Sequence, residues 1–216
     1  RAKAKQLTQS GIEASVTSGV RPLQLAALLQ MCRLDPEPSI LQQAGQLATE
    51  LGKETDQIVA AFNRTELFLE SEHTDLALST LTKLRAAMPK IPHYVERPRL
   101  ASILAELLLL NSESMEARTL VVQCRDEARK FGLMSEQAHA LLLLGRIDSR
   151  NGDIEKAYAN YRQSLQIMKD IAGSITSDAE RMLFQQKRTV QFLVSEIRRL
   201  SSLLDQKQRA GTPALQ

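Results

Sequence analysis

Apolar residues recur at spacings of three and four residues along nearly the whole chain, and this periodicity restricts the fold more than any other feature of the sequence. A period near 3.6 residues places apolar side chains on one face of an α-helix. Nowhere do five or more residues alternate with the period of two that a half-buried β-strand requires. Only 9 glycines and 7 prolines interrupt the 216 residues. The sequence therefore predicts an all-α protein.

Turn-forming residues divide the chain into segments of helical length. Several of these divisions contain a glycine, as at Gly52, Gly132 and Gly152. We expect a first helix within residues 1–20. Further helices are expected near residues 22–33, 39–51, 54–71, 75–87, 98–111, 115–131, 135–151, 153–171 and 177–205.

The composition is that of a folded chain without a strong charge bias. Hydrophobic residues make up 43%, and 28 basic residues against 25 acidic ones give a net charge of +3, so charge alone does not favour a nucleic-acid partner. Cys32 and Cys124 have no disulfide-framework or CxxC spacing, so we expect a reducing, cytoplasmic location. The longest apolar stretch, residues 100–110, is too short for a bilayer, which needs about 20 residues, so we expect no membrane segment. Residues 1–10 lack a Met and an apolar signal region, so we expect the chain to be part of a longer protein.

Small and apolar residues also repeat at an interval of 40 residues, as Ala77, Ala117 and Ala157 show. Three further columns align with them: Leu81, Val121 and Tyr161; Thr65, Ala105 and Gly145; Leu84, Cys124 and Ser164. Small side chains at such positions allow two antiparallel helices to approach to about 8–10 Å. The repeat predicts helical hairpins stacked side by side, an α-solenoid in which each hairpin needs its neighbour.

The clearest copy, residues 144–167, resembles a tetratricopeptide repeat (TPR). The matching positions are the Leu144-Gly145 pair, the Gly152-Asp153 turn, Ala157 and Tyr161. Asp148 stands where the family usually has an aromatic residue, and Ser164 where it usually has alanine. The resemblance covers residues 56–172 and weakens toward the N-terminus. The interval exceeds the usual 34 residues, as in the long-repeat TPR proteins of bacterial signalling.

Together, the turn signals, the apolar periodicity and the resemblance predict four regions. Residues 1–52 form degenerate N-terminal helices, and residues 53–172 form three TPR-like hairpins. Residues 173–206 form one long terminal helix, and residues 207–216 form a flexible tail.

The resemblance also implies a concave groove that is lined by the first helix of each hairpin and binds a partner protein or peptide. The carried-over positions are Val59, Phe62, Glu66, Leu69, Arg99, Ser102, Glu106, Leu109, His139, Leu142, Arg146 and Ser149. Apolar anchors would supply affinity, and Glu66, Glu106 and Arg146 would select charge and register. The alternative is that the apolar positions are packing residues covered by the terminal helix. The Lys and Asn clamp that some family members use for a C-terminal carboxylate is absent.

The predicted terminal helix has a narrow apolar stripe with heptad spacing. Its members are Leu183, Val190, Leu193, Ile197, Leu200 and Leu204. We expect this helix to cap the last hairpin. The alternative is a homodimer, which would make the chain the self-assembly module of a larger signalling enzyme or transcription regulator. The helix is also basic, but it lacks the interleaved aromatic residues of a nucleic-acid surface.

No enzymatic motif is present. The three histidines are scattered without metal-ligand spacing, and no glycine pattern predicts a phosphate loop. We therefore expect no catalytic residues, no metal and no cofactor. A small ligand bound near His139 and Arg146 is a further alternative.

Overall fold

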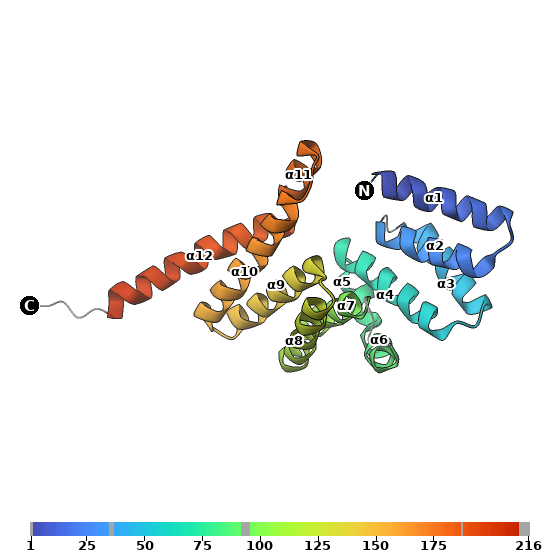
Figure 1. The fold of residues 1–216 in the computed structure, drawn as a ribbon. Helices are drawn as coiled ribbons and strands as arrows, with labels where there is room; N and C mark the ends of the chain where they lie inside the picture. Colours follow the sequence, from blue (N-terminus) through green and yellow to red (C-terminus); the bar gives the residue numbers. More distant parts are fainter. Residues whose placement is uncertain (1, 35–36, 92–95, 187, 212–216) are drawn as a thin grey trace, which may run out of the picture. The chain divides into compact units, whose positions relative to one another are not determined.

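All regular secondary structure in the described residues is helical. A computed structural model describes residues 2–34, 37–91, 96–186 and 188–211, which form α-helices and one short 3₁₀-helix without any β-strand (Figure 1). The prediction of an all-α protein is confirmed for these residues. The chain divides into two compact units, Arg1–His93 and Tyr94–Gln216. The first predicted hairpin belongs to the first unit, and the other two belong to the second.

The first unit is a succession of short-linked helices. They are α1 (Ala2–Thr17), α2 (Arg21–Leu34), α3 (Pro38–Glu50), α4 (Glu54–Glu70), α5 (Thr74–Ser79) and α6 (Leu81–Ala87), followed by the 3₁₀-helix Met88–Lys90. Helix α1 packs against α2, α2 against α3, and α3 against α4. Helices α2 and α3 share a core of Leu25, Leu28, Cys32, Leu41, Ala44, Leu47 and Ala48.

The second unit contains two long hairpins and two further helices. They are α7 (Arg97–Leu110), α8 (Ser114–Lys130), α9 (Met134–Arg150), α10 (Ile154–Gly173), α11 (Asp178–Gln185) and α12 (Arg188–Gly211). Helix α7 packs against α8 and α9, α8 also packs against α9, and α9 packs against α10. Helix α12 then lies against α10 (Figure 1).

The 40-residue interval is visible in the local backbone. The first helices of the three predicted hairpins end at residues 70, 110 and 150, and their partners begin at residues 74, 114 and 154. Glu72, Ser112 and Gly152 follow these ends with φ of 60°, 64° and 79°. The next residue in each turn donates its N–H to the carbonyl five residues earlier, at 2.8–2.9 Å. These bonds form the same Schellman-type helix end three times.

The aligned columns are also buried in the same way. Ala77, Ala117 and Ala157 have no exposed surface. Their partners in the other columns, from Thr65 to Ser164, are buried too. The sequence repeat therefore corresponds to a repeat in helix ends and in burial.

Two predicted helices are each broken in the structure. The segment 75–87 forms α5 and α6, which meet at Thr80. The Thr80 hydroxyl donates to the Ala77 carbonyl at 2.7 Å and also accepts from the Thr65 hydroxyl at 2.9 Å. A threonine hydroxyl that bonds to the preceding turn competes with the helical backbone.

The prediction of one terminal helix over residues 177–205 is wrong. Helix α11 ends at Gln185, a turn follows at Gln186, and α12 begins at Arg188. The chain reverses before this break, between α10 and α11: Arg181 and Phe184 of α11 and Val190 of α12 all line one hollow against α10, and α12 packs along α10 (Figure 1). Helix α12 continues to Gly211, and residues 212–216 of the predicted tail lie outside the described residues.

Candidate interaction surface

Three charged or ionisable side chains meet on α7 and α9 in the second unit. His139 and Arg146 are seven residues apart on α9, so they lie on the same face of that helix. His139 Nε2 donates to Glu106 Oε1 on α7 at 3.0 Å. Arg146 Nη1 lies 3.7 Å from the same oxygen. We call Glu106, His139 and Arg146 the polar cluster.

The polar cluster is ionic but not sealed from water. Burial by itself would raise the pKa of Glu106, but the hydrogen bond and charge of His139 and the charge of Arg146 outweigh it and lower this pKa. The exposed fractions of the Glu106, His139 and Arg146 side chains are 23%, 39% and 41%. A partner could therefore reach all three groups.

Helix α12 contacts the same face of α9. The Arg146 guanidinium lies 5.0 Å from the ring centroid of Phe192, a cation–π geometry. The Phe192 ring packs edge-to-face on Tyr161 of α10, with centroids 5.9 Å apart. Arg199 Nη2 donates to Ser149 Oγ at 3.2 Å. Arg146 and Ser149, two of the predicted groove positions, are thus partly covered by a helix of the chain itself.

The remaining predicted groove positions of the second unit separate into two groups. Ser102, Leu109 and Leu142 are buried, and Ser102 Oγ lies 3.1 Å from Cys124 Sγ. These three residues are interior, as the alternative interpretation proposed for Leu109 and Leu142. Arg99 is partly exposed. The surface on this face is therefore polar rather than apolar.

The predicted groove positions of the first unit lie on α4. Val59 and Phe62 are buried, and Phe62 has no exposed surface. Glu66 and Leu69 are partly exposed. Two of the three apolar anchors expected here, Val59 and Phe62, are therefore interior residues of their unit.

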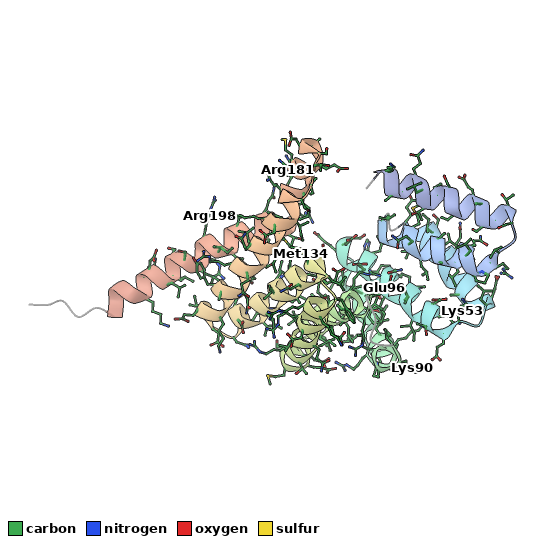
Figure 2. All side chains as sticks on the ribbon, in the orientation of Figure 1. Lys53, Lys90, Glu96, Met134, Arg181 and Arg198 are labelled. Atoms are coloured by element: carbon green, nitrogen blue, oxygen red, sulfur yellow. The ribbon has the colours of Figure 1, made fainter. Side chains whose placement is uncertain are left out.

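The heptad stripe on α12 faces the chain itself. Leu193 and Leu200 are buried, and Val190, Ile197 and Leu204 are half-buried; the side chain of Leu183 lies outside the described residues. Lys207 Nζ donates to Glu155 Oε1 at the start of α10 at 2.7 Å. Arg198, by contrast, points into solvent from α12 (Figure 2). This arrangement is the one expected of a capping helix.

Sequence reasoning missed two residues that organise this part of the fold. Asp148 is fully buried, and its carboxylate accepts from Arg118 Nη1 at 2.5 Å and from Asn160 Nδ2 at 2.7 Å. The available signal was that Asp148 stands at the position where the TPR resemblance predicts an aromatic residue. Phe192 lies outside the heptad stripe, and no spacing rule marked it.

The described residues hold no cluster of three or more His, Cys, Asp or Glu side chains suited to a metal ion. None of the described helices combines the length and the apolar character needed to cross a bilayer. No protein-family model matches the chain, and no curated protein matches it either. Evidence for function therefore comes from the geometry of the chain itself.

Proposed function

We propose that the chain is a non-catalytic protein–protein interaction module, built as an α-solenoid of TPR-like hairpins. Three observations support the architecture: the helix ends recur every 40 residues, the aligned columns are buried alike, and α7 to α10 pack as neighbouring hairpins. Gly145 meeting Tyr161 between α9 and α10 also agrees with the TPR resemblance. Arrays of this type present one face of each first helix to a partner.

The observation that carries the functional proposal is that two side chains of α12 contact α9, while the helix itself packs along α10. Arg146 and Ser149 hold α12 through Phe192 and Arg199. This face of the array therefore has the side chains needed to hold a helix. Glu106 and His139 remain partly exposed, and Glu106 lies next to Arg146. A partner segment would bind there, with the polar cluster selecting its charge and register.

Site-specific crosslinking tests this function. A photo-crosslinking amino acid replaces His139 in one full-length variant and Met115, an exposed residue of α8, in a matched variant. We expect a partner protein to crosslink at position 139 and not at 115. Arg146→Glu should abolish this crosslink; because it also removes the contact with Phe192 and puts a second carboxylate beside Glu106, circular dichroism must show that the variant is still folded. Equal crosslinking at both positions, or an unchanged crosslink in a folded Arg146→Glu variant, would contradict the proposal.

A self-assembly role through α12 is the second candidate. It is favoured by Ile197, which is half-buried and lines a shallow hollow of about 590 Å³ with Tyr158 and Leu165 of α10. Sedimentation equilibrium separates the two functions. The interaction module predicts a monomer, whereas self-assembly predicts a dimer that Ile197→Asp dissociates.

A further inference from the structure

A second surface, in the first unit, has the form of a binding groove. It lies between α3 and α4, has a volume of about 980 Å³ and is also lined by Lys83 of α6. Its floor is apolar: Leu41 and Ala60 are buried, and Leu67 and Phe68 are half-buried. The groove is separate from the polar cluster and belongs to the other unit.

Gly45 of α3 lines this groove, although the packing of the folded chain does not require a glycine at this position. A Cβ atom added at Gly45 would meet no other atom within 4 Å. Glycine in a helix interior lowers stability relative to alanine. Helix α3 is therefore less stable with Gly45 than it would be with alanine, although the fold leaves room for a side chain. The missing side chain keeps the floor low, so a polypeptide backbone can approach α3 and α4 closely.

The charged groups of the groove are predominantly basic. Arg64 and Lys83 line it, are exposed and make no ion pair within the described part of the chain. Glu50 also lines the groove, but its carboxylate pairs with Arg21 of α2. The groove therefore presents two unpaired cations and no unpaired carboxylate. A ligand that supplies carboxylates would complement this charge.

Amide side chains complete the rim. Gln42 and Gln46 are exposed on α3 and lie one helical turn apart on the same face. Each amide has donors and an acceptor, so it can bond to the N–H and C=O groups of an extended peptide. An apolar floor with an amide rim suits a polypeptide better than a nucleic-acid strand, which requires stacking platforms.

We propose that this groove binds an acidic polypeptide segment of a partner protein. Carboxylate side chains of the segment pair with Arg64 and Lys83, and its backbone lies over Gly45. Alternate apolar side chains contact the floor at Leu67 and Phe68. The site is independent of the function proposed for the second unit, so failure of either proposal leaves the other standing.

Fluorescence anisotropy with the full chain tests the proposal. The probes are a labelled peptide of alternating Glu and Leu, a peptide of the same length with Lys in place of Glu, and a single-stranded oligonucleotide. We expect only the acidic peptide to bind, with an affinity that falls as salt rises. Arg64→Glu combined with Lys83→Glu should weaken binding at least tenfold. Arg198→Glu, which reverses an exposed cation of α12, is the matched control and should change affinity less than twofold.

Gly45→Leu provides the sharpest variant, because it fills the groove without meeting any atom of the folded chain at Cβ. We expect a melting temperature at or above that of the wild type and at least a tenfold loss of acidic-peptide binding. Wild-type affinity in folded Gly45→Leu would overturn the proposal. So would absence of acidic-peptide binding, or oligonucleotide binding that depends on Arg64 and Lys83.

Discussion

Gly145 of α9 lies directly against the ring of Tyr161 on α10. A Cβ atom at Gly145 would stand 2.4 Å from Tyr161 Cε1, closer than any real Cβ contact. Tyr161 is buried and also meets Phe192 of α12, so its ring has little freedom to move away. This contact therefore sets how closely α9 and α10 approach and supports the seating of α12.

Gly145→Ala should consequently destabilise the second unit. The added methyl forces the ring or the helices apart, which typically costs about 1–3 kcal/mol. Gly45→Ala is the matched control, because that helical glycine has open space and alanine should add about 0.5–1 kcal/mol. Chemical denaturation of both variants checks the prediction. Equal shifts in the same direction would contradict the close contact.

The buried carboxylate of Asp148 predicts an asymmetry between its partners. Asp148 has no exposed surface, whereas the Arg118 side chain is 35% exposed. Arg118→Ala leaves a buried carboxylate with only Asn160 as a partner, and such losses cost about 3–5 kcal/mol. Asp148→Asn leaves a guanidinium that water can reach, so it should cost less, about 1–2 kcal/mol. Urea unfolding of both variants measures the two losses in unfolding free energy. A larger loss for Asp148→Asn than for Arg118→Ala would contradict this prediction.

Much of the helical framework could be predicted from the sequence, because it follows from local signals. Apolar periodicity identified the helices, and the 40-residue columns identified helix ends that recur at residues 70, 110 and 150. The break at Thr80 was missed, because it depends on a hydroxyl contact with Thr65 on another helix. The break after Gln185 was missed as well, because no glycine or proline marks it in the sequence.

The candidate site was predictable only in part. The repeat frame marked Glu106, His139 and Arg146, and the structure brings these three residues together. The same 40-residue repeat pattern does not distinguish exposed positions from interior ones such as Phe62 and Leu142, which are buried. Burial depends on which helix covers a face, and one repeat pattern is compatible with both outcomes. The groove beside Gly45 had no motif at all.

The lowered pKa of Glu106 predicts a dependence of stability on pH. A carboxyl group whose folded pKa lies below its unfolded value, about 4.3, stabilises the fold above that pH. This contribution is lost as the pH falls through the folded pKa. Glu106→Gln should therefore cost about 0.5–1 kcal/mol at pH 7 and less below pH 4. Unfolding curves at pH 7, 5 and 3.5 check this, and a constant difference would contradict it.

The packing of α12 predicts unequal effects for neighbouring residues. Leu200 is buried, and Leu200→Ala should cost about 2–5 kcal/mol because it leaves a cavity beneath α12. Arg198 is exposed on the same helix, and Arg198→Ala should change stability by less than about 0.5 kcal/mol. Thermal unfolding gives both values. Comparable effects would mean that α12 is not packed on its own chain in solution.

The two cysteines predict slow thiol chemistry in the folded protein. Both thiols are free and buried. Burial raises the pKa of Cys124 to about 11, so this thiol remains protonated at pH 8 and reacts poorly. Its sulfur also donates to the Pro98 carbonyl at 3.0 Å, so the side chain is held inside the unit.

We expect Ellman's reagent to modify Cys124 in minutes or less after denaturation and at least 100-fold more slowly in buffer. Because Cys32 lies in the first unit and Cys124 in the second, Cys32→Ser isolates the rate at which the second unit opens. Rapid reaction of Cys124 in a folded Cys32→Ser variant would contradict its burial between α7 and α8.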